Sequence, residues 1–485
     1  MKIHVADLFC GAGGTSTGLL HACDELGLDP TLVAINHWDE AIATHQYNHP
    51  TAQHLCANLD NVDPVKVVPG RHLHLLVASP ECTHHSRARG GRPMSDQSRA
   101  SVWHIMRWVE VLRVDHLLIE NISEFLSFGP LNANGRPIKK KKGQGFLAFI
   151  HALEAMNYRV EWRITNCANF GDPTSRERLF IQARRGNGAI TWPEPTHSAT
   201  GNPDLFGGLQ KWRGARDIID WSIPSQSIFT RKNPLRPKTL ARIEAGLKKF
   251  GGAHADPFLV ILRRHQNGRA ITDPLPTLTA AGTHIGLCEP TYYPAYTDEQ
   301  QGQTIPPFIV PQSSIIAPRE LDQPLSTITT TSRGIGLVEP FLLPHRVFQQ
   351  MDVDSIDRPM RTLIGKNAGD VALVEPFLIQ FNRNAEPRRL QDPLPALTTR
   401  NHMALIVVNG NPYYCDIRFR MLTRRELSLA MGFPDTYHFT GTKEAQTRMI
   451  GNAVPCATAK ALCLTILKRY AQQRRPHPRS QLHAA

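Results

Sequence analysis

Short apolar runs alternate with amphipathic stretches over roughly the first 185 residues of the chain. Runs that are apolar almost throughout are typical of strands buried on both faces of a parallel sheet. On this basis we expect five strands, at 3–9, 31–36, 73–79, 116–121 and 178–184. Between them, STGLLHACDELG and ASVWHIMRWVEVLRV have apolar residues at helical spacing. The alternation predicts an α/β fold in which helices cover a parallel sheet.

The pattern changes near Asn187, where proline, threonine and glycine become more frequent. A unit at 256–290 is echoed at 306–340, and two further copies begin with PFLLPH and PFLIQF. Each copy opens on Pro-Phe, has a proline followed by Leu or Met at its centre, and ends in an apolar run. β-Branched residues separated by prolines predict short strands joined by turns, so we expect four copies of one small β unit. These repeats are either a scaffold or a surface that reads nucleic acid.

Helical patterns return after Asp416, in LTRRELSLAMGF and ATAKALCLTILKRYAQ. We therefore expect an α/β domain built from two separate parts of the chain, 1–186 and 416–472. The repeat-bearing, β-rich domain would occupy 187–415 between them, and 473–485 would form a disordered tail.

A chain of 485 residues is long enough for two or three domains. Its hydrophobic content of 41% and charged content of 20% are ordinary for a soluble globular protein. No apolar run is long enough to span a bilayer, and the N-terminus enters an expected strand at once. We therefore expect no membrane association and a cytoplasmic location.

The formal net charge is +13, which favours a polyanionic partner such as nucleic acid. The densest positive run is Lys139–Lys142. It is either a solvated loop or a phosphate contact, and sequence alone favours the solvated loop.

The segment DLFCGAGGTSTGL, at 7–19, follows an expected strand and opens an expected helix. Gly11, Gly13 and Gly14 allow a tight turn and close approach of a ligand to the backbone. The G-x-G-x-x-G spacing of dinucleotide sites is absent, which counts against NAD.

Together with later motifs, this segment resembles the DNA (cytosine-5)-methyltransferase family, and the resemblance covers almost the whole chain. The motifs occur in family order, with the repeats where that family carries its target recognition domain. The resemblance implies a Rossmann-like class I S-adenosyl-L-methionine-dependent methyltransferase domain with a smaller β-rich target recognition domain. The later motifs are Pro80-Glu81-Cys82-Thr83, Glu120-Asn121-Ile122, Arg176-Glu177-Arg178, LTRRELSLAMGFPD at 422–435, and Gly451-Asn452-Ala453-Val454-Pro455.

The resemblance implies methyl transfer from S-adenosyl-L-methionine to carbon-5 of cytosine in double-stranded DNA. Cys82 would add to carbon-6 of the ring and so make carbon-5 nucleophilic. Glu120 would donate a proton to N3, Arg178 would hold O2, and Arg176 would contact the adjacent phosphate or the thiolate loop. Because this base is inaccessible within a duplex, it would flip into the pocket.

The implied cofactor site lies mainly at the ends of the expected strands. Its residues would be Phe9, Gly11, Ala12, Gly13, Gly14, His37, Trp38, Asn58, Leu59, Ser79, Asn452 and Ala453. His37 stands where the family has a ribose-binding glutamate, so that role falls to His37 or to Asp39. Glu81, Thr83 and Thr174 also depart from the family pattern, which suggests a divergent branch typical of phages or mobile elements.

His84 and His85 beside Cys82 raise the possibility of zinc. Only one cysteine lies nearby, and none of the nine cysteines forms a C-x-x-C pair, so we expect no metal site.

The expected partner is double-stranded DNA, the expected state is a monomer, and a cognate restriction endonuclease is a candidate partner. The setting would be the cytoplasm of a bacterial or phage-infected host cell. Two alternatives stay open: a tRNA cytosine-5 methyltransferase, and a catalytically weak DNA-binding or decoy protein.

Overall fold

The structure is a computed structural model, and the chain separates into two compact units. The first unit comprises Met1–Trp221, Ile271–Thr283 and Leu422–Ala485, and the second comprises Ser222–Ala270 and His284–Met421. The residues described are 1–80, 100–134, 136–202, 208–229, 231–250, 256–263, 268–280, 282, 284–294 and 411–472, with short strands between 308 and 408.

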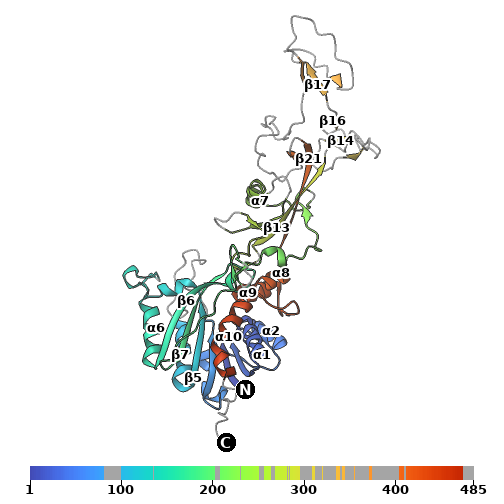
Figure 1. The fold of residues 1–485 in the computed structure, drawn as a ribbon. Coiled ribbons are helices and arrows are strands. Elements are labelled where there is room, and N and C mark those ends of the chain that lie inside the picture. The colour runs from blue at the N-terminus through green and yellow to red at the C-terminus, as the bar shows by residue number, and fades with distance from the viewer. Residues whose placement is uncertain are drawn as a thin grey trace, which may run out of the picture. The chain divides into compact units, whose positions relative to one another are not determined.

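A seven-stranded sheet forms the centre of the first unit, in the order β3-β2-β1-β4-β5-β7-β6 (Figure 1). The first five strands in that order are parallel, and the five strands expected from sequence are all present. The bounds are β1 Lys2–Leu8, β2 Asp29–Asn36, β3 Gln53–Cys56, β4 His72–Ala78, β5 Arg113–Asn121, β6 Tyr158–Asn166 and β7 Glu177–Arg185.

The expectation of a wholly parallel sheet was wrong for one strand, β7. β7 runs antiparallel to both β5 and β6. Only residues 167–176 connect β6 to β7, and a parallel pair needs a crossover of a dozen or more residues. The short connection therefore reverses the chain direction.

Helices cover both faces of this sheet (Figure 1). On one face, α5 and α6 supply Trp108, Phe149 and Leu153 to a core that also contains Leu8 and Ile119 of the sheet. On the other face, side chains of α1 and α10 pack on the opposite residues of the same strands. The helices of this unit are α1 Gly14–Glu25, α2 Asp39–Asn48, α3 Pro64–Val67, α5 His104–Val111, α6 Gln144–Ala155, α8 Arg424–Ala430, α9 Lys443–Asn452 and α10 Cys456–Gln472.

No single helix among the described residues is long and apolar enough to cross a membrane, although the bent pair α9 and α10 meets the length and composition criteria together.

The first unit continues past the boundary that we expected at residue 186. Trp192 is buried in the same core as α1 and α10, and its indole N–H donates to Glu161 of β6 at 3.1 Å. The indole N–H of Trp212 donates to Asn169 at 3.0 Å. These apolar and polar anchors attach the segment up to Trp221 to the α/β unit.

The second unit contains a sheet in the order β10-β21-β13-β11-β12, with β20 paired to β21. Helix α7 (Pro237–Phe250) packs on it through Ile243, which shares a core with Phe258 and Phe419. The strands are β10 Gln226–Ser227, β11 Phe258–Ile261, β12 Arg269–Ala270, β13 Ile285–Pro294, β20 Ala404–Val408 and β21 Asn411–Met421.

The internal repeat corresponds to a repeated strand pattern. In each of the first three copies, one strand begins at the Phe of Pro-Phe. It lies between a two-residue strand and the strand formed by the apolar run at the end of the copy, and it is antiparallel to both. The prediction of short strands is thus confirmed for these copies. Beyond β11–β13, the strands are β14 Phe308–Pro311, β15 Arg319–Glu320, β16 Ile335–Val338, β17 Phe341–Pro344, β18 Asp354–Ser355 and β19 Val371–Leu373.

A buried carboxyl joins the C-terminal helix to the turn between β6 and β7. Asp172 accepts from the backbone N–H groups of Ala457 and Thr458 at 3.1 and 2.9 Å, and from the Thr458 hydroxyl at 2.6 Å. Burial raises the pKa of Asp172 to about 7. This side chain supplies acceptors for the first turn of α10, whose N–H groups have no partner within the helix.

We expect Asp172→Ala to lower the free energy of unfolding by about 3 kcal/mol, because buried donors lose their acceptor. Asp63→Ala removes the half-exposed cap of α3, whose carboxylate accepts from Val65 N–H at 3.1 Å, and should cost about 1 kcal/mol or less. Urea unfolding of the two variants measures both effects. Equal decreases in the two variants would contradict a special role for Asp172.

Candidate active site

The carboxyl ends of four parallel strands lie in one row. Leu8 pairs in register with Ile35 and with Ala78, and Ala78 pairs with Ile119. The residues that follow along the chain therefore meet at one edge of the sheet. The strand order reverses between β1 and β4, and ligands of open α/β sheets bind outside the strand ends at such a point. Most of the expected site residues lie along this edge.

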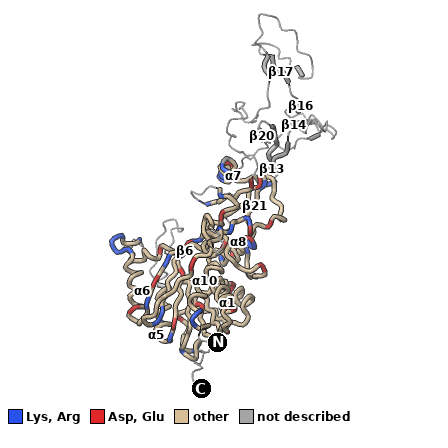
Figure 2. The backbone as a smooth tube through the Cα atoms, in the orientation of Figure 1, with Lys and Arg blue, Asp and Glu red and all other residues tan. Residues whose placement is uncertain are grey.

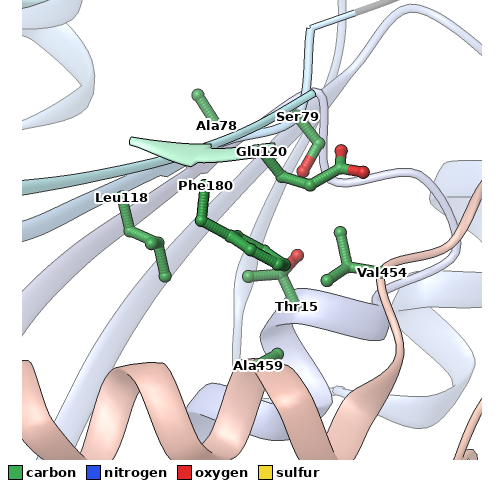
Figure 3. Close-up of a pocket in the computed structure, with 8 residues that line it drawn as sticks. All are labelled: Thr15, Ala78, Ser79, Leu118, Glu120, Phe180, Val454 and Ala459. Carbon is green, nitrogen blue, oxygen red and sulfur yellow. The ribbon is translucent and has the colours of Figure 1, made fainter. Parts of the chain in front are cut away.

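A small pocket opens at this edge and collects residues from distant parts of the sequence (Figure 3). Glu120 and Ser79, both expected in the site, line it at the ends of β5 and β4. The backbone N–H of Ser79 donates to Leu8 O at 3.1 Å, which ties β4 to the end of β1. The full lining is Thr15, Ala78, Ser79, Leu118, Glu120, Phe180, Val454 and Ala459.

Glu120 forms an ion pair with Arg178, with Oε1 and Nε 2.9 Å apart. Each side chain is only 12% exposed. Glu120 lies opposite Phe180 in the antiparallel pair, and Arg178 is two residues from Phe180 on the same strand. The two side chains are therefore diagonal neighbours on one face of the sheet. The structure thus brings together two residues that the motifs predicted for one base.

Arg176 occupies a different environment. It is 2% exposed, and its Nη1 donates to the backbone carbonyl oxygens of Leu278 and Gly451 at 3.3 and 3.0 Å. The side chain joins the segment that leads into β7 to residues 271–283 and to the Gly-Asn-Ala-Val-Pro motif. Its expected phosphate contact stays a prediction beside this structural role.

The three glycines of the strand–helix turn differ in their surroundings. A Cβ at Gly11 would meet nothing closer than Phe9 O at 4.0 Å. At Gly13 it would lie 2.7 Å from the Tyr437 hydroxyl, and at Gly14 it would lie 2.3 Å from Val454 O. The protein itself thus fills the positions that a side chain at Gly13 or Gly14 would occupy, and the expected part of these two glycines in ligand binding stays a prediction. The backbone at Gly11 is open to close approach of a ligand.

A buried polar network holds the glycine turn from behind. The Tyr437 hydroxyl donates to Ala12 O, and it also lies 3.2 Å from His49 Nε2. Thr17 Oγ1 donates to Gly13 O at 2.7 Å and lies 3.1 Å from the same His49 nitrogen. Burial lowers the pKa of His49 to about 4, so at neutral pH its ring is an uncharged partner.

A second chain of hydrogen bonds runs from β1 through α1 and α2 to β3. Ser16 Oγ donates to Asp7 at 2.6 Å, His45 Nε2 lies 2.9 Å from Ser16 Oγ, and His45 Nδ1 lies 2.9 Å from His54 Nε2. Burial raises the pKa of Asp7 to about 7 and lowers that of His45 well below its usual value. Because Ser16 gives its proton to Asp7, His45 donates through Nε2 and accepts from His54 through Nδ1. His45 behind the glycine turn is therefore neutral and hydrogen-bonded through both ring nitrogens.

Trp38 follows β2 and is half-buried beside α9. Its backbone N–H donates to Asn36 Oδ1 at 2.9 Å, and its indole N–H donates to Glu40. The Arg448 guanidinium carbon lies 4.6 Å from the centre of the Trp38 ring. A planar base that stacks on Trp38 must use the other face of the ring or displace Arg448.

The other expected cofactor residues differ in how far they are exposed to solvent. Asn58 is exposed and precedes the short helix Leu59–Asn61, in which Leu59 is buried in the core. Asn452 is exposed at the end of α9, whereas Ala453 is 8% exposed and packs near Gly14. His37 and Asp39 are both exposed at the end of β2, so the choice between them stays open.

Sequence reasoning missed several residues that the structure places at this edge. Thr15, Phe180 and Val454 line the pocket. Thr15 and Val454 lie inside recognised motifs, and Phe180 follows Arg178 by two residues. Their position inside or next to a motif was the available signal for these three. No sequence signal linked Tyr437 or Arg448 to residues some 400 positions earlier, because only the fold brings them together.

Cys82, with His84 and His85, lies outside the described residues. Within the part of the chain that the structure describes, no group of three or more His, Cys, Asp or Glu side chains could hold a metal ion. The expected role of Cys82 therefore rests on the sequence motif.

Comparison with known proteins gives a match to a family model described as C-5 cytosine-specific DNA methylase. It covers residues 3–205 and 373–468, which is more than half of the chain. With the observed sheet, this match confirms the expected Rossmann-like class I methyltransferase fold.

Two curated relatives illustrate how far sequence similarity extends. Type II methyltransferase M.AgeI of Thalassovita gelatinovora is 24% identical over 486 residues, covering 95% of this chain and 98% of that protein. Type II methyltransferase M.XorII of Xanthomonas oryzae pv. oryzae is 29% identical over 203 residues, 40% of this chain and 43% of that protein. Among solved structures, a Spodoptera frugiperda DNMT2 mutant aligns with a TM-score of 0.47 at 15% identity, covering 96% and 99% of the two chains.

Gly14→Ala should be more destabilising than Gly11→Ala. The new methyl group at Gly14 would meet a backbone carbonyl that cannot move aside, so we expect a decrease in stability of about 2–3 kcal/mol. At Gly11, where φ is +54°, the cost is that of a left-handed alanine, about 1 kcal/mol. Urea unfolding compares the two, and a larger decrease for Gly11→Ala would contradict the packing described for this turn.

His49 should make the protein acid-sensitive. Its pKa is lowered in the folded state, so its stabilising contribution is complete above the ordinary pKa of 6.5 and is lost as pH falls toward about 4. His49→Gln removes this proton uptake. The deficit of the variant relative to the original protein should therefore shrink below pH 6.5, by at most about 1.4 kcal/mol per pH unit. Unfolding measured from pH 7.5 to 4.5 tests this, with exposed His438→Gln as control; a deficit constant with pH would count against it.

Proposed function

Because this chain belongs to the C-5 cytosine-specific DNA methylase family, we propose that it transfers a methyl group from S-adenosyl-L-methionine to carbon-5 of cytosine in double-stranded DNA. The observation that carries this proposal is the Glu120–Arg178 pair, because its Glu120 lines the pocket where β4, β5 and β7 meet the α1 and α10 segments.

In this proposal Glu120 and Arg178 bind the Watson–Crick edge of the flipped cytosine. The carboxyl of Glu120 would donate a proton to N3 as the ring accepts the electron pair of the attacking thiolate. Arg178 would hold O2. Their shared face and 2.9 Å separation allow both to reach one pyrimidine edge. Low exposure excludes water, which strengthens these interactions.

Cys82 is proposed as the nucleophile that adds to carbon-6. It follows β4 by four residues, and β4 ends at Ala78 in the wall of the pocket. A cytosine ring is too electron-poor at carbon-5 to accept a methyl group unaided, and addition of a thiolate at carbon-6 removes that obstacle. After methyl transfer, loss of the carbon-5 proton and of the thiolate restores the aromatic ring.

The residues at the strand ends fit a nucleoside-containing methyl donor. The open space at Gly11 admits a ligand close to the backbone, Trp38 offers an aromatic face, and Asn58 presents an exposed amide. S-Adenosyl-L-methionine bound there would supply an electrophilic methyl group on its sulfonium. We propose that Phe9, Gly11, Ala12, Gly13, Gly14, Trp38, Asn58, Leu59, Ser79, Asn452 and Ala453 hold it, with His37 or Asp39 at the ribose.

The second unit is proposed as the target recognition domain. Its repeated small sheets resemble one another in strand order but differ in the residues between the strands. Such variation suits a surface that reads several base pairs, because different base edges need different side chains. The similarity to type II methyltransferases favours a cognate restriction endonuclease as partner. A monomeric state stays a prediction.

Substitution of Cys82 should abolish methylation. Plasmid DNA from cells that express the protein should contain cytosines protected in bisulfite sequencing, and the same experiment reports the target sequence. Cys82→Ser should abolish this protection, whereas Cys23→Ala, which removes a buried thiol of α1, should keep it. A duplex with 5-fluorocytosine at the target should trap the original protein in a denaturation-resistant complex.

Two results would contradict the proposal in different ways. Full methylation by Cys82→Ser would refute the covalent mechanism. Methyl incorporation into tRNA and not into duplex DNA would favour the tRNA alternative, and binding of DNA without any product would favour the decoy protein.

A further inference from the structure

The loop between β5 and α6 presents the densest positive charge in the described part of the first unit. Lys139, Lys140, Lys141 and Lys142 are all exposed, and none forms an ion pair with a described carboxylate. Residues 125–153 contain no Asp or Glu, while Arg136 adds a further positive charge. We define residues 128–134 and 136–143 as the lysine loop.

The backbone of the lysine loop is ordered by its own hydrogen bonds. Asn132 N–H donates to Arg136 O at 2.8 Å, and Ile138 N–H donates to Pro130 O at 3.1 Å. At the base, Gly145 N–H donates to Phe128 O at 2.9 Å. The lysines therefore extend from a pre-shaped support, so less order has to be imposed on them when a ligand binds.

The loop also lies at the edge of the sheet that carries the pocket. The chain enters it directly from Glu120 and Asn121 at the carboxyl end of β5, through the short helix Ser123–Ser127. It then continues into α6, which returns along the sheet toward the start of β6 (Figure 1). Figure 2 shows the lysine loop as a blue segment at the N-terminal end of α6.

We propose that the lysine loop binds the phosphate backbone of the DNA substrate beside the target cytosine. This proposal rests on the proposed function. Lysine ammonium groups on flexible stems suit phosphates whose exact positions vary with sequence, and such interactions position a duplex without reading its bases. The phosphate contact is thus the second of the two interpretations that the sequence pattern left open.

The test is the salt dependence of duplex DNA binding by the full chain. Replacing Lys139, Lys140, Lys141 and Lys142 with Gln should reduce the slope of log affinity against log salt by about 0.9 for each phosphate that the loop neutralises, up to about 3.6. The matched control replaces four exposed cations outside the loop with Gln: Lys2, Lys66, Arg113 and Lys468. A variant with four arginines in the loop keeps the charge and should restore the slope.

The loop variant should also raise the KM for DNA. Its kcat at saturating DNA and the sequence that it methylates should stay unchanged. An unchanged slope, or an equal decrease in the control, would overturn the inference, as would a lysine-dependent slope steeper for tRNA than for duplex DNA. The proposed function is judged separately, by methylation with the original protein. A protein that methylates DNA but shows no effect of the loop variant refutes only the lysine loop.

Discussion

The register between β5 and β7 is the constraint on which the site depends. Glu120 lies opposite Phe180, so Glu120, Phe180 and Arg178 share one face of the sheet. A slip of one residue would turn Arg178 to the opposite face and leave a carboxylate in the pocket without its cation. Antiparallel pairing of β7 is essential to this geometry, because it brings the start of β7 to the end of β5. The buried apolar residues of both strands, among them Leu118 and Ile181, hold that register.

The site is completed by parts of the chain that lie far from it in sequence. The turn between α9 and α10 packs against Gly14, and Tyr437 reaches the carbonyl of Ala12. Arg176 donates to Gly451 in the same C-terminal segment. The glycine turn is thus enclosed by protein on one side and open at Gly11 on the other. A segment that returns after some 200 intervening residues can still be an integral part of the α/β unit, because it contributes α10 to the core.

The buried histidine behind the glycine turn is paired in a way that avoids buried charge. His45 is neutral and bonded through both ring nitrogens, and burial shifts the pKa of Asp7 to about 7. Unpaired charge at these positions would cost far more than the bonds contribute. Positive charge is kept instead at the surface, in the lysine loop, where water solvates it until an anion binds. The interior of the unit therefore supports the turn, while the exposed edge carries the charge for a polyanion.

The sequence by itself determined the α/β character, the five principal strands, the repeated small sheets and the order of the motifs. It could do so because burial on both strand faces and the chemistry of short motifs both leave local patterns. Only the tertiary structure decided that β7 runs antiparallel, that Arg178 pairs with Glu120, and that Arg176 is buried against backbone carbonyls. It also decided which glycine is open, and it joined Tyr437 and Arg448 to residues near the N-terminus. These features depend on interactions between segments hundreds of residues apart, and local hydrophobic periodicity contains no information about which distant segment will fill a given space.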